Sequence, residues 1–180
     1  MKNYIEEASV TMSTSFHSDK VSHELLKHVL EICIPELRDL DFIKKALFYG
    51  KGLTPPLESS EKCIGRSPIQ IRGLSPDPYT AINLLHGIIG LATEAGELLE
   101  ALLLSLNGQE IDVVNISEEV GDIQWYAAAI LKAIGSDFET VQRTNIAKLR
   151  ARFPNKFTEY DANNRNLDIE RAILEGGEHF

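Results

Sequence analysis

Two pairs of acidic side chains stand at helical spacing in otherwise apolar stretches of the sequence. Glu94 and Glu97 are three residues apart, and so are Glu119 and Asp122. Side chains three apart lie next to each other on a helix, so each pair presents two carboxylates to one side. Glu118 lies four residues before Asp122, so the same geometry leaves it as an alternative to Glu119.

If the two helices that carry these pairs pack antiparallel, the four carboxylates can converge inside a bundle. Close carboxylates cannot all stay ionised in a dry site unless they protonate, pair with Lys or Arg, or bind cations. Ligands that are all oxygen suit Mg²⁺, and we expect Mn²⁺ to substitute for it. A di-iron centre is disfavoured, because it would need Glu-x-x-His pairs and these two helices contain none.

Each acid pair also has an ordinary structural explanation. Glutamates three apart are common on solvent-exposed helix faces, although the stretch from Asp77 to Glu110 contains no Lys or Arg to balance them. The helix dipole favours acids in a first turn, which explains Glu118 and Glu119 better than Asp122. The two pairs together favour a cation site more than either pair does alone.

Two glycines share the helical stripe of the first acid pair. Gly87 and Gly90 lie on it together with Asn83 and Ala101. Glycine inside a helix costs about 1 kcal/mol relative to alanine, so we expect it to allow the close approach of a neighbour or a ligand. The opposite face is broad and apolar, with Leu84, Leu85, Ile88, Leu91, Ala92, Leu98, Leu99, Leu102 and Leu103.

Capping signals predict the helices that hold these residues. The first helix should begin near Asp77-Pro78 and stop after Leu106, at Asn107-Gly108. Asn115 with Glu118 resembles a capping box for the second helix, which should end at Gly135. Further helices are expected from Asp137 to about Phe153 and over about 167–175. Few stretches alternate with period two, so the predicted fold is an all-α helical bundle of four to five main helices.

The first half of the chain is patterned more weakly. Apolar residues at helical spacing predict a helix over 21–34, which Pro35 should interrupt, and a second one over 36–49. Residues 51–78 are rich in Pro, Gly and Ser and predict a long connector. We expect a single all-α domain over 1–180, with 1–20 weakly patterned, catalytic helices over 78–153 and a C-terminal tail and helix over 154–180.

Composition narrows the range of partners. The 27 acidic against 18 basic residues give a net charge of −9, which disfavours nucleic-acid binding. No apolar run is long enough to cross a membrane, and residues 1–20 do not form a signal peptide. Cys33 and Cys63 cannot build a disulfide framework, so we expect a reducing, cytoplasmic setting with Cys33 as a small buried side chain.

These residues resemble the MazG-like superfamily of all-α nucleoside triphosphate pyrophosphohydrolases, which also includes dimeric dUTPases and dCTP pyrophosphatases. The resemblance rests on "GLATEAGELLEAL", on "EEVGDIQWY" and on "NIAKLRARFPNKF", and it covers about 78–174. The family pattern often starts with two adjacent acids, whereas this chain has Thr93 before Glu94. The first 75 residues carry a weaker likeness, mainly in "IKKALFYGK".

The resemblance implies hydrolysis of a nucleoside triphosphate between its α and β phosphates, with Mg²⁺ as cofactor. It implies that the metal is held by Glu94, Glu97, Glu119 and Asp122, with Glu97 or Glu118 as the base. It also implies nucleotide contacts from Asn145, Lys148 and Arg152, and assembly as a homodimer or homotetramer. We also expect a phosphate contact from Lys44, Lys45 and Lys51 and a sugar or base contact from Asn83. Tyr49 and Trp125 could stack on a base, although Trp125 fits the core better, and His86 has a structural or supporting place.

Two alternatives remain open at this point. One is an enzyme of the same superfamily narrowed to a single nucleotide such as dUTP or dCTP, or acting on phosphoribosyl-ATP, because spacing does not reveal the shape of a base pocket. The other is a catalytically weak helical interaction module. The presence of all four acids of the motif disfavours such a module.

Overall fold

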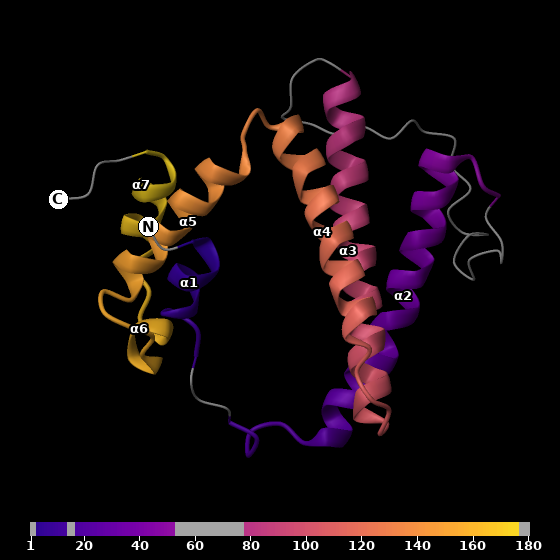
Figure 1. The fold of residues 1–180 in the computed structure, drawn as a ribbon, viewed down its shortest axis with the longest axis horizontal. Coiled ribbons are helices and arrows are strands. Elements are labelled where there is room, and N and C mark those ends of the chain that lie inside the picture. The colour runs from indigo at the N-terminus through magenta and orange to yellow at the C-terminus, as the bar shows by residue number, and fades with distance from the viewer. Residues whose placement is uncertain (1–2, 14–16, 53–77, 177–180) are drawn as a thin grey trace. The chain divides into compact units, whose positions relative to one another are not determined.

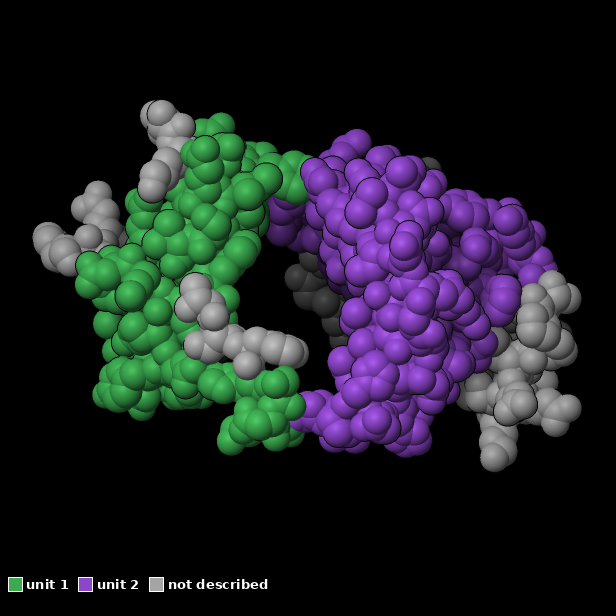
Figure 2. All heavy atoms as spheres, turned by 60° about the horizontal axis from the view of Figure 1, so that its bottom comes forward, with its two compact units in different colours: residues 1–20, 136–180 green, residues 21–135 purple. Residues whose placement is uncertain are grey.

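The computed structural model describes residues 3–13, 17–52 and 78–176. Contacts group the chain into two compact units, which are described separately: Met1–Lys20 with Ser136–Phe180 form unit 1, and Val21–Gly135 form unit 2 (Figure 2). Most of the expected connector over 51–78, together with Cys63, lies outside the described residues. All regular structure in the described ranges is helical, which confirms the all-α prediction.

Unit 2 is built from three long helices. They are α2 (His23–Tyr49), α3 (Pro78–Leu106) and α4 (Val113–Ala133). Helix α3 packs against both α2 and α4, and successive helices run in opposite directions (Figure 1). The antiparallel packing that the acid pairs require is therefore present between α3 and α4.

Helix α2 is one continuous helix, so the predicted break at Pro35 is wrong. Proline has no N–H, so the carbonyl of Glu31 loses its helical hydrogen bond at this point. Both residues are exposed, and water can replace that bond. The ends follow ordinary capping rules: the Ser22 hydroxyl accepts from the N–H of Leu25 at 3.0 Å, and Gly50 ends the helix in the left-handed region at φ 65°.

Helix α3 has the predicted bounds, but the start of α4 differs from the expected capping box. Asp112 is its N-cap, and the carboxylate accepts from the N–H groups of Val114 and Asn115 at 2.9 and 3.2 Å. Asn115 therefore lies inside the first turn. Its side chain is free to donate to Glu119, at 2.8 Å. Gly108 and Gly135 both have positive φ where the chain leaves α3 and α4.

The two glycines of the α3 stripe are required by the close approach of α4. A Cβ at Gly90 would lie 2.1 Å from Cε1 of Tyr126, and one at Gly87 would lie 2.6 Å from Cγ1 of Ile130. Both separations are far below van der Waals contact. At these two glycines the stripe therefore faces α4, as the sequence interpretation of a close neighbour expected.

Unit 1 combines both ends of the chain. It contains α1 (Tyr4–Ser9), α5 (Phe138–Arg152), α6 (Glu159–Asn163) and α7 (Leu167–Leu174). Helix α5 packs against α1 and α7, and the Tyr4 hydroxyl donates to Asn145 Oδ1 at 3.3 Å. Asp137 caps α5 as predicted, whereas the short helices α1 and α6 were not predicted.

The buried apolar core of the described residues is small. Its members are Leu30, Ile34, Tyr126, Ile146, Phe153 and Ile173. Many large apolar side chains remain exposed, including Ile82 and Ile88 on α3 and Trp125 on α4. Cys33 is only half-buried. Among the described helices, none combines the length and the apolar character that a membrane span requires.

Candidate functional site

Three of the four predicted carboxylates converge where α3 faces α4. Glu94, Glu119 and Asp122 each contribute an oxygen, and these oxygens all lie within 4.8 Å of one another. Glu94 and Glu119 are buried, with 7% and 4% of their surface exposed, while Asp122 is open to solvent. The group is therefore a half-enclosed set of carboxylate oxygens with one solvent-exposed member, and such oxygens could hold a hard divalent cation.

Glu97 and Glu118 lie outside this group of three. Both side chains are exposed, and Glu97 is one turn further along α3 than Glu94. Partial burial raises the pKa of Glu97, and the charges of Glu94 and Asp41 add to this effect. Glu97 thus lies within electrostatic reach of the group without being one of its three converging side chains.

Glu119 is buried beside other carboxylates, which disfavours its charged form. Burial, together with the charges of Glu97 and Glu94, raises the pKa of Glu119 to about 7, against the lowering effect of the hydrogen bond from Asn115. A buried carboxylate in such company needs a compensating positive charge to stay ionised. The three carboxylates therefore lack part of the positive charge that would keep them all ionised, and a bound cation could supply it.

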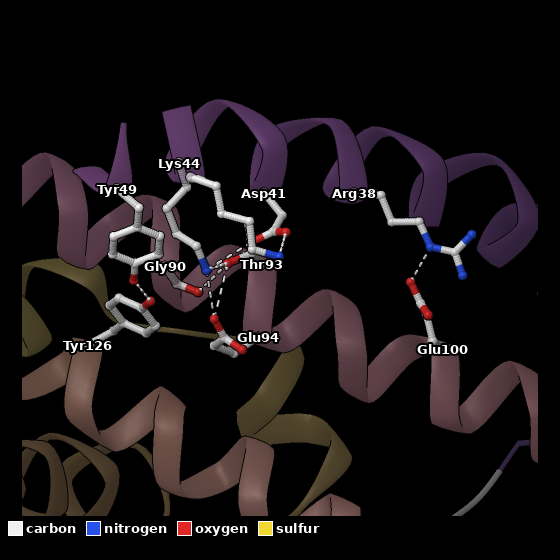
Figure 3. Close-up of polar contacts among 10 residues, drawn as sticks. Arg38, Asp41, Lys44, Tyr49, Gly90, Thr93, Glu94, Glu100 and Tyr126 are labelled. Carbon is white, nitrogen blue, oxygen red and sulfur yellow. Dashed lines mark hydrogen bonds and ion pairs between the residues drawn. The ribbon is translucent and has the colours of Figure 1, made fainter. Parts of the chain in front are cut away.

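One positive charge is already in place beside the group, on Lys44 of α2 (Figure 3). The ammonium donates to Thr93 Oγ1 at 2.7 Å and to Glu94 Oε1 at 2.8 Å, and it lies 3.1 Å from Asp41 Oδ1. Burial favours a lower pKa for Lys44, but the hydrogen bonds to Glu94 and Asp41 outweigh it and raise the pKa. Lys44, expected to contact substrate, is thus occupied by protein partners.

Aromatic rings surround the other end of this cluster. The phenol groups of Tyr49 and Tyr126 lie 3.4 Å apart, and the Lys44 ammonium lies 5.1 Å from the centre of the Tyr126 ring. Burial and the Tyr49 hydroxyl raise the pKa of Tyr126 to about 12. The ring of Trp125 contacts that of Tyr126 edge to face. Trp125 is 58% exposed, so the prediction that it lies in the core is wrong for the single chain.

His86 lies inside the aromatic cluster, which agrees with the structural place expected for it. It stacks on Phe48 with ring centres 4.0 Å apart. Its Nε2 atom is buried and has no hydrogen-bond partner among the described residues. Burial lowers the pKa of His86, and the charge of Lys44 adds to this, so the ring is held neutral.

The predicted nucleotide-contacting residues of α5 belong to unit 1. Arg152 makes a two-pronged ion pair with Glu170, at 2.7 Å from Nε and 2.5 Å from Nη2. Asn145 accepts from Tyr4, and Lys148 is half-buried. The guanidinium of Arg152, which the sequence interpretation assigned to phosphate, is therefore engaged by Glu170 in this structure.

The remaining predicted contacts lie on α2 and α3. Asn83 and Lys51 are exposed, and Lys45 pairs with Asp41. Sequence reasoning missed Asp41, which binds both lysines. Its spacing, three and four residues before Lys44 and Lys45, was the available signal for ion pairs along one helix face.

Taken together, α3 and α4 define an antiparallel helix pair with a buried carboxylate group. Residues 85–157 match the model of the MazG nucleotide pyrophosphohydrolase domain family. Over this segment, the match confirms the resemblance to the MazG-like superfamily that the sequence motifs predicted. No curated protein and no solved structure gives a significant match. Helix α2, with Asp41 and Lys44, lies outside the matched segment.

Proposed function

We propose that the protein is a Mg²⁺-dependent nucleoside triphosphate pyrophosphohydrolase that converts a (d)NTP to the (d)NMP and pyrophosphate, with Mn²⁺ able to replace Mg²⁺. The observation that carries the proposal is the convergence of Glu94, Glu119 and Asp122 within the MazG-like segment. Glu94 comes from α3 and the other two from α4, so the helix pair itself sets the spacing of the group.

In this proposal the three converging carboxylates hold the cation. A divalent cation bound there neutralises charge on the triphosphate and polarises the phosphoryl group that is attacked. Glu97 is adjacent but outside the group, so its carboxylate is available to accept the proton of the attacking water or to act as a further ligand. Glu118 is the alternative base, because it is exposed at the same end of α4.

Binding of the nucleotide is assigned to the basic and amide side chains predicted from the sequence. Lys148, Arg152 and Asn145 of α5 are the proposed phosphate and sugar contacts. Asn83, Lys45 and Lys51 are proposed as further contacts. To bind a phosphate, Arg152 would have to release Glu170, which now accepts two hydrogen bonds from its guanidinium. A phosphate can accept the same two hydrogen bonds.

The test is a panel of nucleoside triphosphates incubated with the purified protein and Mg²⁺, with identification of the products. Pyrophosphate and the monophosphate are expected from at least one nucleotide. Orthophosphate as the product would indicate another class of phosphohydrolase. The absence of turnover for every nucleotide would favour the non-catalytic interaction module.

Two substitutions test the assignment of residues. Asp122→Asn and Glu97→Gln are each expected to lower the hydrolysis rate by about 100-fold or more, because each removes a charge from the reacting site. Glu110→Gln, at an exposed acid outside the group, is the matched control and should keep the wild-type rate. Circular dichroism checks the fold of all three variants. Wild-type rates in Asp122→Asn would contradict the cation site.

Specificity for one base is the second candidate function within the same chemistry. The exposed rings of Tyr49 and Trp125, at 52% and 58%, lie beside His86 and Tyr126 and offer a stacking surface for a base, which by itself selects no particular base. Flat exposed rings can stack on any base. The same nucleotide panel distinguishes the two cases, because a specific enzyme turns over one base much faster than the other bases.

A further inference from the structure

The most unusual charge in unit 2 is a lysine enclosed among acids. Only 3% of Lys44 is exposed. Its ammonium has three hydrogens and three close oxygen partners, on Thr93, Glu94 and Asp41 (Figure 3). To reach a phosphate, Lys44 would have to give up these partners. The geometry therefore favours a role toward the protein's own carboxylates.

The partner that matters is Glu94, because it also belongs to the group of three converging carboxylates. Oε1 of Glu94 is held by Lys44 at 2.8 Å and lies 3.4 Å from the Thr93 hydroxyl. The Thr93 hydroxyl also donates to the carbonyl of Gly90 at 2.9 Å. Glu94 is thus paired with the positive charge of Lys44 before any cation is bound.

The neighbouring lysine shows that this arrangement is particular to Lys44. Lys45 shares the carboxylate of Asp41, but its side chain is 38% exposed and it pairs with no acid of the group. An ion pair that served only to join α2 to α3 could lie near the surface. Arg38 and Glu100 form such a pair, with Nε and Oε1 2.5 Å apart. Lys44 instead places its charge where it acts directly on the group.

We propose that Lys44 is a built-in counter-ion: it compensates Glu94 while the carboxylate group is without a cation, and it lowers the affinity of that group for divalent cations. The physical reason is competition between like charges for the same carboxylates, in a site where burial weakens screening. Lys44 is thus a positioning residue that sets cation affinity. The inference rests on the proposed function, in which Glu94 is a ligand.

The experiment measures the dissociation constant of Mn²⁺ alone, from the electron paramagnetic resonance signal of the free ion. Lys44→Met removes the charge and the donor, and Lys44→Gln removes the charge but keeps a donor. Both variants should bind Mn²⁺ about tenfold or more tightly than the wild type, because a repelling charge is lost. Asp41 keeps its pair with Lys45 in both variants.

The matched control is Lys132→Met, at an exposed lysine in the last turn of α4, which should leave Mn²⁺ affinity unchanged. Without metal, Lys44→Met should melt at a lower temperature than the wild type, because Glu94 is left unpaired. A role in folding alone would lower the melting temperature without tightening Mn²⁺ binding. Equal or weaker binding in both Lys44 variants would overturn the proposal, and Lys44→Gln decides if Lys44→Met does not fold.

Nucleotide hydrolysis by the wild type, measured in parallel, separates this inference from the proposed function. Tighter Mn²⁺ binding in the variants without any wild-type hydrolysis would support the role of Lys44 and contradict the enzyme. Hydrolysis with unchanged Mn²⁺ affinity in the variants would overturn only the counter-ion. If none of the four proteins bound Mn²⁺, both proposals would be overturned.

Discussion

Buried charges among the described residues lie in ion-pair clusters, and the two units have opposite charges in excess. In unit 2, a single buried lysine, Lys44, is shared by Glu94 and Asp41. In unit 1, a single acid, Glu170, is shared by Arg152 and Arg165. Negative charge is thus in excess around Lys44 in unit 2, whereas positive charge is in excess around Glu170 in unit 1.

The cluster in unit 1 gives a pH-dependent stability. Hydrogen bonds from Arg152 and Arg165 lower the pKa of Glu170 from its ordinary 4.5 to about 2. A lowered pKa means that the stabilisation is fully present above pH 4.5 and is lost as the pH falls toward 2. At pH 7, Glu170→Gln should therefore be less stable than the wild type by about 2 kcal/mol, since bonds to charged groups contribute about 1.5–3 kcal/mol.

Urea unfolding followed by circular dichroism at pH 7, 4.5 and 3 measures this effect. The difference between wild type and Glu170→Gln should shrink at the lowest pH. Glu175→Gln is the matched control, because Glu175 pairs with Arg171 at the surface, with 58% of its side chain exposed, and such pairs contribute little. A difference that stayed constant over this pH range would contradict the ion pairing of Glu170.

At the residue scale, the sequence was sufficient to predict the acids of the carboxylate group. It was not sufficient to predict the positive charge that compensates them. Glu94, Glu119 and Asp122 were predicted from helical spacing within an apolar context. The place of Lys44 depends on how α2 packs on α3, and a lysine among charged neighbours at the end of a helix looks solvent-exposed in the sequence. Arg152 shows the same limit, because its partner Glu170 lies eighteen residues further along the chain.

At the element scale, the contact between α3 and α4 depends on the absence of a side chain at two positions. Gly90→Ala should destabilise the protein by about 1–3 kcal/mol, because its Cβ would overlap the ring of Tyr126. Gly121→Ala is the control: nothing lies within 4 Å of the added Cβ, so alanine should stabilise α4 by up to about 1 kcal/mol. Denaturant midpoints measure both changes, and equal effects would contradict the close packing at Gly90.

Helix bounds could be predicted wherever local capping chemistry decides them. Pro78, Asn107-Gly108 and Asp137 placed the ends of α3 and the start of α5 correctly. The prediction failed at Pro35, where an exposed proline costs one hydrogen bond but packing against α3 keeps α2 continuous. It also failed at Asn115, because Asp112 three residues earlier competes for the same N–H groups and is the actual cap.

At the scale of the whole molecule, the small core is the feature that needs an explanation. A chain of 180 residues normally buries a large share of its apolar surface. Yet no described side chain is less than 2% exposed, and unit 2 buries only Leu30, Ile34 and Tyr126 among its described apolar residues. Helices in this state are stabilised when further apolar surface covers them, which supports the predicted assembly of identical chains.

Sedimentation equilibrium tests this assembly directly. The chain has a mass of 20.1 kDa, and the particle in solution should have two or four times that mass at micromolar concentration. A concentration series provides the control, because a stable assembly keeps its mass on dilution. A particle of one chain mass over the whole series would contradict the prediction.

The position of α2 has a practical consequence for anyone who trims this protein. The segment that matches the MazG family model begins at residue 85, after the helix that carries Asp41 and Lys44. A fragment cut to that segment would keep every acid of the group and lose the ammonium ion that accompanies them. In such a fragment the negative charge on α3 and α4 would no longer be compensated by Lys44. Its affinity for metal ions would therefore not represent that of the intact chain.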